Sequence, residues 1–236
     1  MEISVPFLLR YIYRNPKLLL LGIVSGMSVS LWIFRVIVTH DGNYFFMVWN
    51  LFLALLPLLV AKALYELDRI DRLPLLPRLT GLAAWLLLVP NSYYMITDLM
   101  HIKYADPSTI WYDSLMFFSF AMTGTLAGIY SWYIIHRLVA GWHGSVLAWL
   151  GVLVSSGLVS FGIYLGRYGR WNSWDILTNP MALGWGIWDS AHNPLARQHT
   201  VAFTFTLLLV YVAFYAYYEL RKYEEISECR TVSPGD

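Results

Sequence analysis

The second apolar run of the chain decides its fold class. Residues 44–64 read YFFMVWNLFLALLPLLVAKAL, and Lys62 is the one charged residue among them. A helix that crosses the hydrocarbon core of a bilayer needs about 20 mostly apolar residues. Backbone groups in hydrocarbon must also find their hydrogen bonds within the segment. This run is therefore predicted to be a transmembrane helix.

Other long runs share this apolar character and complete the prediction of the fold. They cover residues 18–38, 79–97, 113–135, 145–165 and 201–219. None alternates apolar and polar residues as a membrane-barrel strand does. The sequence predicts an all-α integral membrane bundle of about six transmembrane helices. We expect one polytopic domain over residues 1–222 and a polar, disordered cytoplasmic tail over 223–236.

Two segments outside these runs are predicted to lie at the membrane surface. Before the first run, apolar residues of the stretch 7–12 alternate with Arg10, Arg14 and Lys17. This pattern is typical of an interfacial amphipathic helix. The stretch 172–190 is rich in Trp but contains Pro180 and several glycines. It is too interrupted to span, and we expect it to lie at the interface or to re-enter the membrane.

The composition excludes several classes of protein. The chain has 236 residues, of which 58% are hydrophobic and 13% are charged, whereas a soluble domain carries about 25% charged residues. A net charge of +1 argues against a nucleic-acid partner, which would need a basic stripe. Cys229 is the one cysteine, so the chain forms no internal disulfide and no cysteine metal site.

The distribution of Lys and Arg predicts the orientation. Alternating the six runs across the membrane places eleven of these residues on the side of both termini and five on the other side. Cytoplasmic loops carry the excess of positive charge. Both termini are therefore predicted to be cytoplasmic, and the loops after the first, third and fifth runs to be extracytoplasmic.

A polar cluster closes the third run on the predicted outer side. If the helix continues, Asn91, Tyr94, Asp98 and His101 fall at i, i+3, i+7 and i+10, which is one stripe. Asp113, before the fourth run, can supply a second carboxylate. Polar groups in hydrocarbon need partners, since leaving them unpaired costs several kcal/mol.

This first cluster has three interpretations. Asp98, His101 and Asp113 can form an acid/base set, or they can bind a divalent metal ion, because Asp and His are ordinary ligands for such ions. The spacing Asp-x-x-His lacks the specificity of a zinc-protease signature. The third interpretation is a structural hydrogen-bond network between helix ends. The spacing alone favours this third interpretation over the other two.

A second polar cluster follows the fifth run. Arg167 and Arg170 lie three residues apart, and guanidinium groups bind carboxylate or phosphate with two parallel hydrogen bonds. With Asn172 and Asp175 they can hold an anionic ligand such as a lipid phosphate. The alternative is an Arg–Asp175 ion pair between loops. Ser173 can cap a following helix, and as a nucleophile it lacks the Gly-x-Ser-x-Gly elbow.

Further polar residues in the apolar runs are expected to join helices. Arg35 either reaches the interface with its long side chain or pairs with Asp98 or Asp113. A lone intramembrane amide such as Asn50 more often connects helices than binds a ligand. His136 is predicted on the cytoplasmic side, away from the first cluster.

Small residues in two of the runs point to close helix packing. Gly124 and Gly128 form a Gly-x-x-x-Gly pattern in the fourth run, and Gly157 and Gly162 lie in the fifth. Such residues let helix backbones approach closely in membranes. They form no phosphate-binding loop, because neither a Walker motif nor a dinucleotide fingerprint is present.

Several stretches together resemble a family of bacterial membrane proteins known as DUF1361. They are residues 43–54, residues 90–98 with His101, residues 111–113, and residues 164–175. The resemblance covers the chain from about 40 to 180. It implies a multi-pass protein of the bacterial inner membrane and no particular reaction. Its matching positions fall on the polar residues named above.

Three functions fit these expectations. The first is a membrane-embedded enzyme that acts on a lipid or a lipid-linked anionic substrate, with Asp98, His101 and Asp113 as the catalytic set. The second is a small transporter or a lipid- or ion-binding protein, although transporters place charges near the midplane and show internal repeats. The third is an accessory subunit whose polar face docks a partner. An exposed apolar patch on its loops would favour this function, and the candidates are Trp171, Trp174, Trp185 and Trp188.

Overall fold

The computed structural model describes residues 15–232, and the side chains of residues 15–224. The predicted interfacial helix around residues 7–12 lies outside this range. Within it the chain forms helices and turns and no strand. The helices are α2 (Pro16–Thr39), α3 (Phe45–Ile70), α4 (Leu75–Asp98), the 3-10 helix η1 (Leu99–Tyr104), α5 (Ile110–His143), α6 (Ser145–Tyr168), α7 (Asp175–Thr178), α8 (Pro180–His192) and α9 (Pro194–Val232).

Six of these helices are long and apolar enough to cross a membrane, which confirms the predicted number of spans. They are α2, α3, α4 with η1, α5, α6, and α9 as far as Glu224. The stretch 172–190 forms the short helices α7 and α8, neither of which is among the spans. The molecule is therefore a multi-pass, all-helical membrane protein.

Two helices differ in extent from the predicted runs. α4 continues through Pro90 and ends at Asp98, where the backbone tightens into η1. α9 continues to Val232, into the tail expected to be disordered. No proline or glycine follows Pro194 until Pro234, and Glu, Arg and Lys favour helix. The helix therefore does not end where the apolar run ends.

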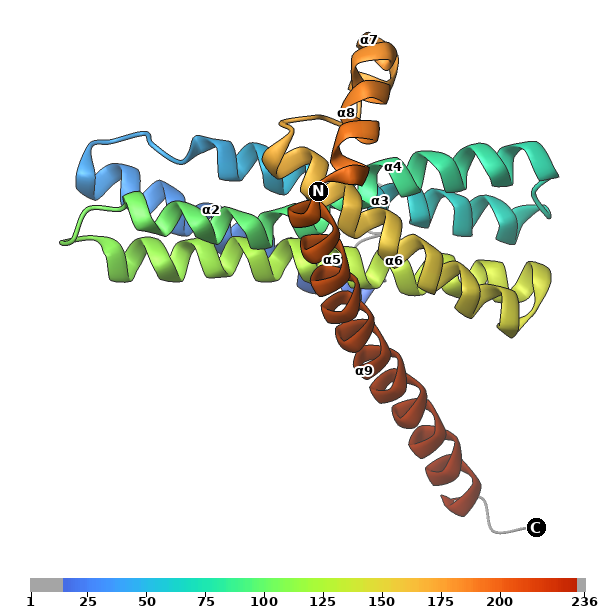
Figure 1. Ribbon diagram of the computed structural model, residues 1–236. Helices are drawn as coiled ribbons and strands as arrows, with labels where there is room; N and C mark the ends of the chain where they lie inside the picture. Colours follow the sequence, from blue (N-terminus) through green and yellow to red (C-terminus); the bar gives the residue numbers. More distant parts are fainter. Residues whose placement is uncertain (1–14, 233–236) are drawn as a thin grey trace, which may run out of the picture. The chain divides into compact units, whose positions relative to one another are not determined.

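The chain divides into two compact units, Met1–Ser131 and Trp132–Asp236, with α5 contributing to both. In the first unit α3 and α4 pack as an antiparallel hairpin (Figure 1). Its core consists of buried residues from α3, α4 and α5: Met47, Leu51, Ala54, Met95, Met116, Phe117 and Phe120. In the second unit α6 packs along α9.

Glycines on α5 set the close approach of α5 to α4. A Cβ atom added at Gly124 would lie 2.6 Å from the backbone oxygen of Ser92, and one added at Gly128 would lie 2.8 Å from the ring of Tyr93. Only glycine fits at this separation, which confirms the packing predicted for this pair. A Cβ at Gly157 meets nothing within 4 Å, so the same prediction is wrong there: Gly157 faces open space.

Candidate functional site

A buried ion pair joins α2 to α5 in the first unit. Arg35 Nε donates to Asp113 Oδ1 across 2.7 Å, and the Arg35 side chain is 7% exposed while that of Asp113 is fully buried. Asp113 belongs to the first turn of α5, where the helix dipole favours a negative charge. Of the two partners expected for Arg35, the structure selects Asp113.

Neighbouring groups hold this ion pair in place. The Thr109 hydroxyl donates to Asp113 Oδ2 at 3.2 Å. Arg35 Nη1 lies 3.8 Å from Asp41 Oδ2, and its guanidinium lies 4.6 Å from the centre of the Tyr44 ring. Burial raises the pKa of the Tyr44 phenol, and the Asp113 carboxylate raises it further. Tyr44 is therefore neutral at physiological pH and offers Arg35 the face of an uncharged ring.

A second buried carboxylate lies at the end of α4. Asp98 is 1% exposed, and the Asn50 amide of α3 donates to its Oδ2 at 2.9 Å. The prediction that Asn50 joins helices is confirmed by this contact. Asp98 and Asn50 thereby tie α4 to α3 at the point where α4 ends.

His101 lies three residues after Asp98, in η1, and contacts it. Its Nδ1 lies 3.1 Å from the Asp98 backbone oxygen and 3.9 Å from Asp98 Oδ1. The shorter contact is a hydrogen bond and the longer one is an electrostatic contact only. A carbonyl oxygen accepts and never donates, so we assign the neutral imidazole its proton on Nδ1. In this tautomer Nε2 is the basic nitrogen.

Aromatic rings connect the His101 side of the site to the Arg35 side. The His101 ring lies 5.0 Å from that of Phe46 and 6.3 Å from that of Phe117. Phe117 in turn lies 5.0 Å from Tyr44, which covers Arg35. Rings packed in this way restrict the imidazole to one orientation.

The two carboxylates therefore have different surroundings. Asp113 has a permanent cation beside it, whereas Asp98 has an amide donor and a histidine that is 32% exposed. Across residues 15–224, no three His, Cys, Asp or Glu side chains are grouped so that they could hold one metal ion. The structure thus brings Asp98 and His101 together and places Asp113 in the ion pair with Arg35.

The other two residues predicted on the α4 stripe lie earlier on the helix. Both are partly buried. The Asn91 amide donates to the Leu88 backbone oxygen at 3.0 Å, within its own helix. Tyr94 lies one turn before Asp98, and its backbone oxygen accepts from the Thr97 hydroxyl. These contacts do not test whether Asn91 and Tyr94 bind a ligand, so that role stays a prediction.

The second predicted cluster lies in the other unit. Arg167 is in the last turn of α6, and Arg170 follows it with a left-handed backbone (φ 56°). Asp175 Oδ2 accepts from the Asn172 backbone N–H at 2.7 Å, and its Oδ1 accepts from the Thr178 hydroxyl. Asp175 thus closes the turn that starts α7. Because α6 ends at Tyr168, the two arginines do not continue on one helix as expected.

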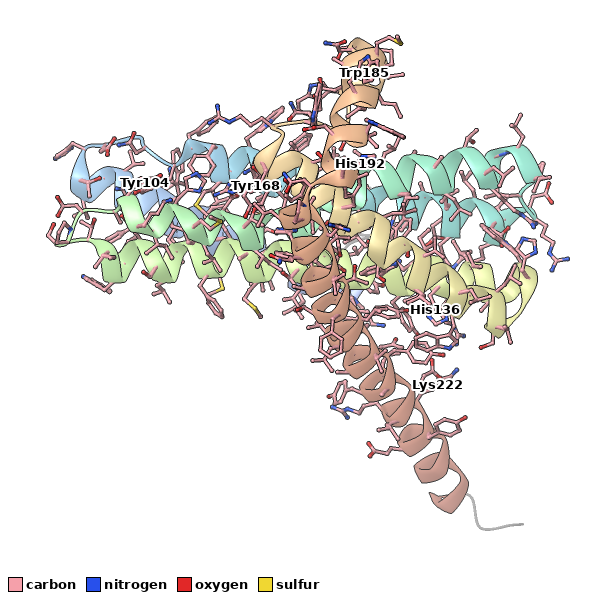
Figure 2. All side chains as sticks on the ribbon, in the orientation of Figure 1. Tyr104, His136, Tyr168, Trp185, His192 and Lys222 are labelled. Atoms are coloured by element: carbon pink, nitrogen blue, oxygen red, sulfur yellow. The ribbon has the colours of Figure 1, made fainter. Side chains whose placement is uncertain are left out.

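In the second unit, aromatic side chains surround one buried histidine, His136, and the sequence alone did not reveal this cluster. His136 is 3% exposed, and its Nδ1 lies 2.6 Å from the Tyr211 hydroxyl. Its ring packs against Trp149 of α6 and Tyr215 of α9. His136 is labelled in Figure 2. Tyr211 and Tyr215 stand at i and i+4 on one helix face, which was a visible signal, but the sequence does not show that this face meets His136.

Comparison with known proteins gives one match. No curated protein and no solved structure matches the chain. A family described as "Protein of unknown function (DUF1361)" matches residues 49–217. The matched range runs from α3 into α9 and contains Asp98, His101 and Asp113. The chain therefore belongs to the DUF1361 family of proteins of unknown function.

Proposed function

We propose that the first unit carries an acid/base site, and that the protein is a membrane-embedded enzyme that acts on a lipid or a lipid-linked anionic substrate. The observation that supports this is the pairing of a buried carboxylate, Asp98, with a partly exposed histidine, His101. The Nδ1 atom of His101 lies 3.9 Å from Asp98 Oδ1, so the two side chains are close enough to act together in a proton transfer. General acid/base catalysis uses histidine more often than any other side chain.

Each residue of the site has a proposed role. His101 accepts a proton at Nε2 and returns it to the leaving group. Asp98 stabilises the imidazolium, and Asn50 fixes the carboxylate through its amide donor. Asp113, predicted as a third catalytic residue, is proposed to act with Arg35 as a positioning pair, because its charge is already balanced.

Most of the residues proposed to bind the ligand can donate hydrogen bonds or carry a positive charge. Asn91 and Tyr94 lie on α4 before Asp98 and are proposed to contact the substrate. Arg167 and Arg170, with Asn172 and Asp175 in the same turn region, are proposed to form an anion-binding site of the second unit. Guanidinium groups suit phosphate because they can donate two parallel hydrogen bonds.

The proposed orientation places the first site at the extracytoplasmic face. We infer that both termini lie on one side, because the number of candidate spans is even, and the excess of Lys and Arg favours the cytoplasm for that side. The segments 40–44 and 105–109 then face outward beside Asp98 and Asp113. Fusions of alkaline phosphatase to the C-terminus and to residue 106 test this: activity is expected at residue 106 and not at the C-terminus. The reverse pattern would overturn the orientation.

The enzymatic proposal is tested by lipid turnover. Purified protein in nanodiscs made from a total bacterial lipid extract is incubated, and all lipids are compared by mass spectrometry. We expect the wild type to deplete one lipid class, and His101→Gln and Asp98→Asn to lower that rate at least about 100-fold. His143→Gln, at an exposed histidine ending α5, is the matched control and should retain the rate. No turnover by the wild type, or equal turnover by His101→Gln, contradicts the proposal.

Elemental analysis tests whether Asp98 and His101 bind a divalent metal ion. Asp98 and His101 are two ordinary ligands for a divalent ion, and substrate or solvent would have to complete the coordination. If a metal serves this site, the wild type contains it in stoichiometric amount and Asp98→Ala and His101→Ala both lose it. A metal that both variants retain belongs elsewhere in the protein.

A further inference from the structure

The connection between α6 and α9 exposes an apolar stripe on a helix that does not span. Met181, Trp185 and Trp188 of α8 are 76%, 70% and 64% exposed. They stand at i, i+4 and i+7 and so share one face. Just before α8, Leu177 of α7 is 83% exposed. No described part of the second unit covers this face of α8.

The opposite face of α8 packs inward. A Cβ added at Gly186 would lie 2.7 Å from Trp171 Nε1, and one added at Gly169 would lie 2.6 Å from Trp171 Cδ1. The Trp171 ring therefore lies between two glycines, one before α7 and one on α8. This contact fixes the rotation of α8 about its axis and turns Trp185 and Trp188 outward.

The topology places α8 between two consecutive candidate spans, at one membrane face. α6 and α9 are both long and apolar enough to cross the membrane, so a connection between these consecutive spans begins and ends at the same membrane face. α8 has 13 residues, about 20 Å of helix, which falls short of the roughly 30 Å hydrocarbon core. α8 can therefore lie at the membrane surface but cannot cross.

The chemistry of the stripe fits the interfacial layer. Trp is enriched there because its ring is apolar while its indole N–H can bond to headgroups or water. Polar residues flank the stripe, with Asn179 before α8 and Asp189, His192 and Asn193 at its end. Residues 171–193 contain Asp175 and Asp189 and no Lys or Arg. The apolar stripe carries no positive charge that would attract anionic lipid, so its insertion should need only neutral lipid.

We propose that α8 lies in the interfacial layer of the bilayer, with Met181, Trp185 and Trp188 inserted among the lipid headgroups and the upper acyl chains. The contact between Trp171 and Gly186 determines which side of α8 faces the bilayer. This interaction surface is independent of the acid/base site, and its partner is a zwitterionic lipid surface.

Spin labels on α8 test this proposal directly. Because Cys229 is the one cysteine, a Cys229→Ser background allows single labels after Trp185→Cys, Trp188→Cys or Met181→Cys. Asp189→Cys gives the matched control at the polar end of the same helix. Each labelled protein is placed, one copy per disc, in nanodiscs of neutral phosphatidylcholine. Collisions with oxygen, which concentrates in lipid, and with a water-soluble nickel chelate are measured by power saturation.

The expected result is a contrast along one helix. Oxygen collisions should exceed nickel collisions at positions 181, 185 and 188, and nickel should exceed oxygen at 189. Nickel in excess at 185 and 188 would place the stripe in water and overturn the proposal. Low collision rates with both reagents there would show that protein covers the stripe, and this would overturn it as well. Three outward positions keep the test decisive if one variant fails to fold.

Discussion

Arg35 on α2 and Asp113 on α5 form an ion pair whose Nε and Oδ1 atoms lie 2.7 Å apart, with both side chains almost completely buried. The pair connects two spans that are far apart in sequence. Removing one partner of a buried pair leaves an uncompensated charge, whereas replacing both by apolar residues is often neutral. The cost of leaving one charge buried without its partner can therefore be measured separately from the net contribution of the pair to stability.

Arg35→Met is expected to lower the free energy of unfolding by about 3–5 kcal/mol, because it leaves the Asp113 carboxylate buried without its cation. The double variant Arg35→Met with Asp113→Leu should recover most of this loss. Unfolding by SDS in mixed micelles measures both. Arg69→Met is the control, since Arg69 is 69% exposed in its pair with Glu66 and such pairs contribute about 0–1 kcal/mol. Equal losses for Arg35→Met and Arg69→Met would contradict the assignment.

Gly124→Ala should destabilise the first unit by about 1–3 kcal/mol, because overpacking forces the backbone of α4 or α5 to move. The clash is with the Ser92 backbone oxygen, which cannot rotate away as a side chain can. Gly157→Ala is the matched substitution in open space, and it should be neutral or stabilise by up to about 1 kcal/mol through helix propensity. Thermal unfolding in micelles compares the two, and a smaller loss for Gly124→Ala than for Gly157→Ala would refute the close packing.

Tyr211→Phe should destabilise the second unit by about 1–3 kcal/mol, because it removes the hydroxyl bonded to buried His136 Nδ1 and keeps the ring. Tyr217→Phe, at a tyrosine of the same helix that is 60% exposed, should change stability by less than about 0.5 kcal/mol. The same SDS titration measures both variants. A loss at Tyr217 as large as that at Tyr211 would mean that the His136 contact contributes nothing.

Ser108 controls the titration of Asp106 in the segment between η1 and α5. The Ser108 hydroxyl and backbone N–H both donate to Asp106 Oδ1 and lower the pKa of Asp106. Because these bonds lower the pKa of Asp106, they stabilise the turn fully at pH values above the ordinary carboxyl pKa of about 3.9. This stabilisation is lost as the pH falls through the lowered pKa. Ser108→Ala should raise the pKa of Asp106, as followed by carboxyl carbon NMR in micelles. An unchanged titration would show that the turn does not form.

Much of the fold was predictable because hydrocarbon allows so few solutions. Each apolar run of about 20 residues had to become a helix, and the structure has six such spans. Where α4 ends was not predictable in the same way. The stripe from Asn91 to His101 assumed one continuous α-helix, but the chain tightens into η1 after Asp98. In η1, His101 Nδ1 contacts the Asp98 backbone oxygen.

The sequence alone did not determine which groups the buried polar residues contact. Arg35 had two candidate acids, and nothing in its neighbourhood in sequence distinguishes Asp98 from Asp113. Asn50 and Asp98 lie on different helices, so their contact depends on how α3 and α4 register against each other. His136 packs against aromatic rings of α6 and α9, and its neighbours in sequence give no sign of these rings.

The central claim is that His101 serves as an acid/base group whose orientation is set by Asp98. Nitrogen NMR of protein labelled with ¹⁵N-histidine tests it most directly, with His101→Gln identifying the signal among the six histidines. We expect the neutral tautomer of His101 to carry its proton on Nδ1, and the Nε2 signal to shift when the lipid substrate class is added. An imidazole protonated on Nε2, or an Nε2 signal that no lipid perturbs, would contradict the account.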